Sequence, residues 1–138
     1  MEELLKKLCY KSQNRIAVIE APEGFLESMS GTLQEVQIDA LIDPRYLYDF
    51  ILIFVSTTGN IAEMCPKAIH NLSPDGKLWI AFPKNTSKKY STKITRDKGW
   101  EPFEQAGYRR VSQISIDEDW SALRFRNKKY IKSSNKEE

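Results

Sequence analysis

The sequence predicts a single α/β domain with three layers, built on an open, mostly parallel sheet that ends in a C-terminal antiparallel hairpin. Two segments are continuously apolar, "FILIFV" at 50–55 and "LWIAF" at 78–82, as is typical of central parallel strands covered by helices on both faces. A helical pattern between them supplies the crossover that parallel strands require. The segments 108–116 and 120–126 are joined by only three residues, which indicates an antiparallel pair.

The first third of the chain is expected to contribute two strands and two helices. Three leucines share one face of a short amphipathic N-terminal helix: Leu4, Leu5 and Leu8. Residues 15–20 form a predicted strand, and residues 36–41 form a second, shorter one. Between the two strands, Pro22 suits the first turn of a helix, because its missing N–H would have no helical partner there.

The crossover helix between the two apolar strands carries one apolar stripe. Its members are Ile61, Met64, Cys65, Ala68, Ile69 and Leu72. Pro66 interrupts this helix, and a proline in a regular helix interior costs about 3 kcal/mol. We therefore expect one helical turn before Pro66 and a helix that starts again at Pro66. "SPDG" at 73–76 then predicts a type I turn, with Gly76 free to take a positive φ.

The last third begins with a polar, basic segment, residues 84–98, which has no apolar periodicity and predicts a long loop. A short helix at about 100–106 is expected to end at Gly107. The alternation in the closing hairpin fits half-exposed strands near a sheet edge. We assign residues 1–127 to the single domain and 128–138 to a disordered tail of basic and acidic residues.

Length and composition fit one soluble domain that folds without a disulfide or a metal. The chain has 138 residues, 41% apolar and 29% charged. Its longest apolar run is far shorter than the ~20 residues that cross a bilayer, and its N-terminus lacks the order of a signal peptide, so we expect a cytoplasmic protein with no membrane partner. Two cysteines without metal-like spacing and a single histidine predict no metal site.

The net charge of +2 conceals an uneven distribution. Residues 17–63 contain eight acids and one base, whereas residues 64–98 contain eight bases and two acids. Such a division affects the surface potential and the choice of partners rather than the fold.

Three quoted segments carry a resemblance to a known fold: "YDFILIFV", "LSPDGKLWIAFPK", and "GYRRVSQISI" paired with "WSALRFR". Together they resemble the C-terminal half of class I, S-adenosylmethionine-dependent methyltransferases, which are Rossmann-like. Over residues 15–127 the chain also resembles a family of short, uncharacterised bacterial proteins, a domain of unknown function that shares the "PDG-LW-A-PK" run and the closing "W-alR" strand. The resemblance implies a truncated methyltransferase-like fold and no particular activity.

Class I methyltransferases place an acid and three glycines after the first strand, where the backbone approaches the cofactor closely. Here that segment has one glycine, Gly24. Pro22 removes a backbone donor, and Glu23 adds a negative charge near the position of a cofactor carboxylate. The resemblance implies Glu20, Gly24 and Asp39 as the cofactor-binding positions, with Asp43 as an alternative to Asp39; both aspartates also suit turns and helix caps.

Two functions follow as hypotheses. The first is a non-catalytic, methyltransferase-like binding or interaction module that lacks the glycine-rich cofactor loop and uses no cofactor. The second is a small enzyme or ligand-binding protein that holds S-adenosylmethionine, a nucleotide or a phosphate at the C-terminal end of the sheet, where ligands of open α/β sheets bind.

The basic loop is the other candidate site. Its cations alternate with hydroxyl side chains, a combination that suits phosphate groups: Lys84, Lys88, Lys89, Lys93 and Arg96. The partners expected are a phosphate-containing small molecule or, weakly, nucleic acid. The competing interpretation is a solvated loop without a ligand, since runs of charged residues usually form solvated surface. Trp100 is expected to anchor the following helix over the sheet.

Overall fold

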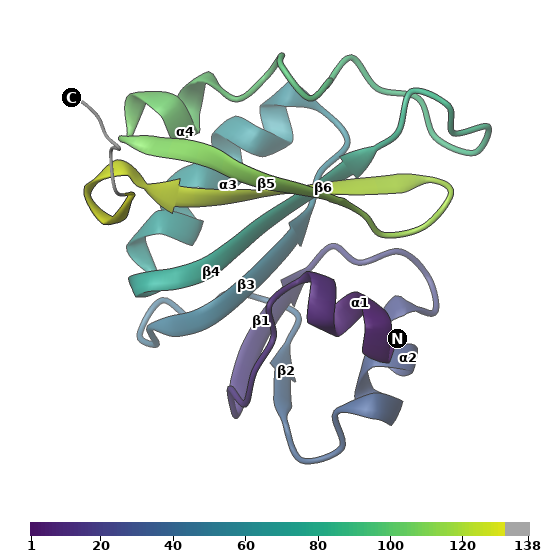
Figure 1. The fold of residues 1–138 in the computed structure, drawn as a ribbon, viewed down its shortest axis with the longest axis vertical. Coiled ribbons are helices and arrows are strands. Elements are labelled where there is room, and N and C mark those ends of the chain that lie inside the picture. Colours follow the sequence, from purple (N-terminus) through teal and green to yellow (C-terminus); the bar gives the residue numbers. More distant parts are fainter. Residues whose placement is uncertain (132–138) are drawn as a thin grey trace.

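A six-stranded sheet forms the centre of the molecule in a computed structural model that describes residues 1–131 (Figure 1). The strands are β1 (Arg15–Ile19), β2 (Gln37–Asp39), β3 (Tyr48–Phe54), β4 (Leu72–Pro83), β5 (Tyr108–Ser115) and β6 (Trp120–Asn127), in the order β2-β1-β3-β4-β6-β5. Neighbours from β2 to β4 pair in parallel, and β6 runs antiparallel to both β4 and β5. The predicted α/β class, the mostly parallel sheet and the closing hairpin are confirmed.

Helices cover the sheet on both faces and produce the three layers. They are α1 (Glu2–Lys7), α2 (Phe25–Thr32), α3 (Thr58–His70) and α4 (Glu101–Gln105). The central strands are buried on both sides because successive side chains point to opposite faces. Along β3, Ile51 and Ile53 pack with α3 and α4, whereas Phe50 and Leu52 pack with α1 and α2.

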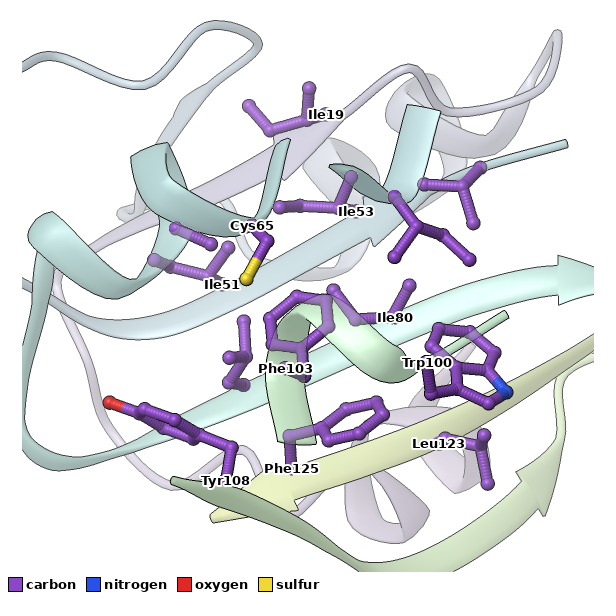
Figure 2. Packing of buried hydrophobic residues seen from close by; sticks show 14 of the residues in the cluster. Ile19, Ile51, Ile53, Cys65, Ile80, Trp100, Phe103, Tyr108, Leu123 and Phe125 are labelled. Carbon is purple, nitrogen blue, oxygen red and sulfur yellow. The ribbon is translucent and has the colours of Figure 1, made fainter. Parts of the chain in front are cut away.

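The layer on the α3 and α4 side is rich in aromatic rings (Figure 2). Phe103 of α4 stacks on Phe125 of β6, with ring centroids 4.7 Å apart. Trp100 lies 5.3 Å from Phe125 and is almost fully buried, and its indole Nε1 donates to the Thr95 carbonyl over 2.8 Å. The predicted anchor role of Trp100 is confirmed.

Two helices differ from the sequence-based expectation. The helix expected around Pro22 begins only at Phe25, because Gly24 takes a left-handed conformation (φ 84°) and serves as its N-cap. α3 is continuous through Pro66 rather than starting again there. Pro66 and Ala62 both lie on the exposed side of α3, so water can satisfy the Ala62 carbonyl that loses its helical donor, while the buried stripe keeps the helix on the sheet.

The predicted turn at 73–76 is a bulge within β4. Tyr48 pairs with Leu72 but Phe50 pairs with Lys77, so the residues between them are inserted without breaking the strand. Asp75, not Gly76, has the positive φ, at 56°. A Cβ on residue 76 would lie 2.8 Å from Leu72 Cδ1 and 3.1 Å from the Tyr48 carbonyl oxygen, so glycine is required by close packing.

The end of the chain also departs from expectation. β6 lies between two strands and is mostly buried, so only β5 is the half-exposed edge strand of the hairpin. Lys128–Tyr130 form a short 3-10 helix, where a disordered tail was expected from residue 128. The rest of the predicted tail, residues 132–138, lies outside the described residues.

Within residues 1–131, none of the helices has the length and hydropathy needed to span a bilayer. The same residues contain no group of three or more His, Cys, Asp or Glu side chains arranged to hold a metal ion. Cys65 is buried in the α3 layer, and burial raises the pKa of its thiol to about 11.

Candidate ligand-binding cleft

A cleft of about 610 Å³ opens at the carboxyl ends of β1 and β3. The chain leaves β1 through α2 towards β2, and leaves β3 through α3 towards β4, on the opposite face. The cleft therefore lies at the topological switch point of the sheet, where ligands of open α/β folds bind. It is lined by Ile19, Glu20, Pro22, Leu41, Ile42, Phe54, Val55, Ser56, Asn60, Glu63, Met64, Lys67, Tyr90 and Trp120.

The walls of the cleft are mainly apolar, and its charged side chains are Glu20, Glu63 and Lys67. Leu41, which follows β2, is 79% exposed at the cleft. The volume falls within the range of small-molecule sites, which combine apolar walls with a few polar groups. The cleft can accept a nucleoside-sized ligand, and its two carboxylates favour hydroxyl or cationic groups over anions.

The wall next to β3 is the N-terminal turn of α3, held by its own side chains. Thr57 is the N-cap, and its hydroxyl accepts from the Asn60 N–H over 3.0 Å. The Asn60 side-chain oxygen accepts in return from the N–H groups of Ser56 and Thr57, at 3.2 and 3.3 Å. This capping box fixes the cleft wall.

The turn after β1 lacks one backbone donor and has another one engaged. Glu20 takes a left-handed conformation (φ 58°) that is strained for a side chain of its size. Pro22 has no N–H, and the Phe25 N–H at the start of α2 donates to the Pro22 carbonyl over 3.1 Å. Backbone donors at such a turn hold a cofactor carboxylate or phosphate in related folds, and two of them, at residues 22 and 25, are lost here.

Four aromatic rings close the other side of the same end of the sheet. Phe25 packs edge-on against Phe54 at 5.1 Å, Phe54 against Trp120 at 5.0 Å, and Trp120 lies 5.0 Å from Tyr90. The rings come from α2, β3, β6 and the loop after β4, so the cluster joins segments far apart in the sequence. Phe25 therefore packs on the end of β3, while the cleft stays open on the side of α3.

The three predicted cofactor positions are not brought together. Glu20 lines the cleft, whereas Gly24 is the N-cap of α2 and does not line it. Asp39 belongs to a separate network, in which its carboxylate accepts from Tyr48 Oη at 2.5 Å, Arg15 Nε at 2.8 Å and Gln37 Nε2 at 2.8 Å. Asp43 accepts from the same Arg15 side chain.

The network of Asp39 is electrostatically satisfied. Burial opposes ionisation of Asp39, but the hydrogen bonds from Tyr48, Gln37 and Arg15 outweigh it and lower the pKa of the carboxyl group. Arg15 also lies over the Tyr46 ring, 4.2 Å from its centroid. These contacts tie β1, β2 and the start of β3 together and leave Asp39 engaged within the protein.

The basic loop divides into two parts. Lys84 and Arg96 line a depression of about 370 Å³ beside β5 and β6, where Lys84 Nζ donates to Ser115 Oγ over 2.6 Å. Lys88, Lys89 and Lys93 are exposed and line neither this depression nor the cleft. The loop contributes only Tyr90 to the cleft, so the predicted anion site and the predicted cofactor site are separate.

Several side chains anchor the basic loop. Ile94 is buried, Thr92 Oγ1 donates to the Ser56 carbonyl over 2.7 Å, and Ser87 Oγ donates to Asp119 over 2.8 Å. Arg96 and Asp97 form an ion pair at 3.8 Å on the surface, and Arg110 approaches the same aspartate to 3.1 Å. These anchoring contacts were not predicted, because the segment is polar and has no apolar periodicity.

Sequence reasoning missed most of the cleft. Met64 was expected only as part of the apolar stripe of its helix, and no role was expected for Leu41, Ile42, Glu63 or Lys67. The i, i+4 spacing of Glu63 and Lys67, on the helix that follows the central strand, was the available signal for their common position.

Comparison with known proteins gives a likeness of fold. No family model matches the chain, and no curated protein matches it, so membership of the expected family of short bacterial proteins stays a prediction. The chain is similar in structure to the N-methyltransferase NodS from Bradyrhizobium japonicum, with a TM-score of 0.59, 14% identity, and coverage of 91% of this chain and 93% of that one.

Two further solved structures show the same likeness. A SAM dependent methyltransferase from Aquifex aeolicus has a TM-score of 0.60 and 12% identity, with coverage of 91% of this chain and 88% of that one. NodS in complex with S-adenosyl-L-homocysteine gives a TM-score of 0.58 and 13% identity over 91% and 84% of the two chains. With the sheet order described above, the chain has the Rossmann-like fold of class I methyltransferases.

Proposed function

We propose that this protein is a methyltransferase-like binding module that does not catalyse methyl transfer. The observation that carries the proposal is the turn after β1, where Pro22 lacks an N–H, the Phe25 N–H is engaged, and the Phe25 ring packs on Phe54. A methionyl carboxylate placed here would lack these two donors and would lie near Glu20. Fold likeness alone does not imply activity.

Calorimetric titration tests this proposal. S-adenosylmethionine and S-adenosylhomocysteine are expected to give no saturable heat at micromolar concentrations. Because we attribute the absence of cofactor binding to the turn after β1, the double variant Glu20→Gln, Pro22→Gly is expected to gain measurable affinity for S-adenosylhomocysteine. Micromolar binding of either compound by the unmodified chain would refute the proposal.

A second candidate function is favoured by the cleft itself. Its volume and apolar walls suit a nucleoside, and Tyr90 and Trp120 supply aromatic surface. Because Glu20 and Glu63 oppose an added phosphate, we expect adenosine to bind more tightly than adenosine monophosphate. Replacing Glu63 with Gln should reduce that difference, whereas Glu23→Gln, outside the cleft lining, should not. Equal affinity for the two compounds would count against this role.

A further inference from the structure

The depression beside β5 and β6 is a second hollow, separate from the cleft. Its volume of about 370 Å³ lies within the range of small-molecule sites. Phe82 of β4 and Ile94 of the basic loop supply apolar surface, and polar side chains supply the rest. The depression shares no lining residue with the cleft at the carboxyl ends of β1 and β3, so the two can hold different molecules.

Ser121 of β6 is the lining residue that indicates a ligand. It is only 7% exposed, and its hydroxyl makes no hydrogen bond to another residue within 1–131. Its cross-strand neighbour Ser115 is already engaged, accepting from Lys84 Nζ over 2.6 Å and donating to the Asp117 carbonyl over 3.3 Å. Buried polar groups of native proteins are nearly always hydrogen-bonded. A molecule held in the depression would supply the partner that the Ser121 hydroxyl lacks.

The walls of the depression are fixed by contacts within the protein. On one side, the Lys84 N–H donates to the Asp119 carbonyl over 2.8 Å. On the other side, Thr95 and Lys98 exchange two backbone hydrogen bonds of 3.2 and 3.3 Å, and the buried Ile94 joins this segment to the core. A ligand entering a hollow with fixed walls has less ordering to impose, which favours binding.

The depression has an excess of positive charge. Lys84 and Arg96 line it together with one acid, Asp97. The Asp97 carboxylate lies 3.1 Å from Arg110 Nη1 and 3.8 Å from Arg96 Nε, so a second base, on β5, offsets its charge. Lys84 uses one donor of its ammonium group on Ser115 and keeps the others. Lys84 and Arg96 can therefore bind an anion, and phosphate in particular, through charge-assisted hydrogen bonds.

The uncharged side chains indicate what the phosphate is attached to. Thr86, Gln113 and Ser121 bring hydroxyl and amide groups, which both donate and accept and so match the hydroxyl groups of a ligand. Phe82 is only 5% exposed and packs edge-on against Trp100, with ring centroids 5.5 Å apart. It offers little surface on which a base could stack. The lining therefore suits a phosphorylated sugar better than a nucleotide.

We propose that the depression beside β5 and β6 binds the phosphate monoester of a sugar. Lys84 and Arg96 bind the phosphate group, while Ser121 and Gln113 form hydrogen bonds to the sugar hydroxyls. The proposal does not depend on the cleft being occupied or on the absence of methyl transfer, because the depression and the cleft have no residue in common.

Nuclear magnetic resonance titration of the ¹⁵N-labelled chain tests the site, with glucose 6-phosphate and ribose 5-phosphate as the probes. At least one of them is expected to shift the backbone amide signals of Thr95, Gln113 and Ser121 saturably. Glucose and inorganic phosphate, added separately, should bind about tenfold more weakly or less, because each makes only part of the contacts.

Substitutions separate the two halves of the site. Lys84→Gln and Arg96→Gln should each lower the affinity for the sugar phosphate about tenfold, since each removes a charged hydrogen bond. Ser121→Ala should lower it about fivefold while leaving the affinity for inorganic phosphate unchanged. Because the Ser121 hydroxyl has no partner within the protein to lose, Ser121→Ala should also unfold at the same or a higher temperature than the original chain.

Lys88→Gln is the matched control. Lys88 is an exposed cation of the same basic loop outside the depression, so its loss should change the affinity less than about twofold. An equal loss in Lys88→Gln and Lys84→Gln would overturn the proposal, because it would indicate general charge attraction. So would the absence of saturable shifts with both sugar phosphates, or an unchanged affinity in Ser121→Ala. Tighter binding of a short oligouridylate at the same signals would assign the surface to nucleic acid instead.

Discussion

Asp39 shows how a single residue can serve stability where the sequence suggested ligand binding. Its side chain is only 12% exposed and accepts three side-chain hydrogen bonds. We expect Asp39→Asn to lower the free energy of unfolding by about 2 kcal/mol at pH 7, since hydrogen bonds to charged groups are worth about 1.5–3 kcal/mol. Urea unfolding monitored by circular dichroism measures the difference.

The pH dependence follows from the lowered pKa of Asp39. A depressed folded-state pKa contributes stability above the ordinary aspartate value of about 4, and that stability is lost as the pH falls through the folded-state pKa. The difference in the free energy of unfolding between Asp39→Asn and the original chain should therefore be smaller at pH 3 than at pH 7. Asp97→Asn, on a 71% exposed aspartate, is the matched control and should cost under about 1 kcal/mol. A gap of equal size at both pH values would contradict this account.

Alanine substitution is expected to have opposite effects on stability at Gly76 and at Gly31. A Cβ on residue 76 would approach the Tyr48 carbonyl to 3.1 Å and Leu72 Cδ1 to 2.8 Å, whereas a Cβ on residue 31 meets nothing within 4 Å. We expect Gly76→Ala to destabilise by about 1–3 kcal/mol through overpacking. Gly31→Ala, in α2, should stabilise by up to about 1 kcal/mol. Thermal unfolding of the two variants checks the signs, and a stabilised Gly76→Ala would show that the bulge is loosely packed.

At the scale of elements, α3 keeps a proline within its exposed face. Pro66→Ala restores the N–H that can donate to the Ala62 carbonyl, at a position where the new side chain faces solvent. We expect the free energy of unfolding to rise by about 2 kcal/mol, somewhat less than the helix-interior penalty of proline because proline also restricts the unfolded chain. Chemical denaturation measures this. An unchanged or lowered stability would mean that the helix needs a distortion at Pro66.

Elements with a strong local pattern were predictable, and those decided by tertiary packing were not. The sheet could be predicted because its signals are local. β3 and β4 are continuously apolar, and β5 and β6 are joined by a short connection. The bulge in β4 depends on pairing with Tyr48, far away in the sequence, and the continuity of α3 through Pro66 depends on its buried stripe. Local propensity does not reflect either of these tertiary contacts.

The candidate sites divided in the same way. Glu20 could be placed at the cleft because the end of a parallel strand at a switch point is a property of the topology. The separation of Asp39 from the cleft could not be predicted, since it depends on the side chains of Arg15 and Tyr48, which approach Asp39 only in the folded chain.

At the scale of the whole molecule, the aromatic cluster of Phe25, Phe54, Tyr90 and Trp120 joins four distant segments at the carboxyl end of the sheet. Trp120 is 6% exposed and also lines the cleft, so its removal should leave a cavity continuous with the cleft. We expect Trp120→Ala to lose about 3–5 kcal/mol of stability. Added indole should restore part of it by binding the vacated space, seen as a rise in unfolding temperature that the original chain does not show.

Trp79→Ala supplies the control for this experiment. Trp79 is fully buried, packs beneath α1 and does not line the cleft, so its loss should cost as much stability without an open route for indole. Rescue of Trp120→Ala alone would mean that the cluster is the wall that limits the cleft. That result would place the restriction on ligand size in contacts between distant segments, separately from the donors lost in the turn after β1. Equal rescue of both variants, or of neither, would contradict a cleft bounded by Trp120.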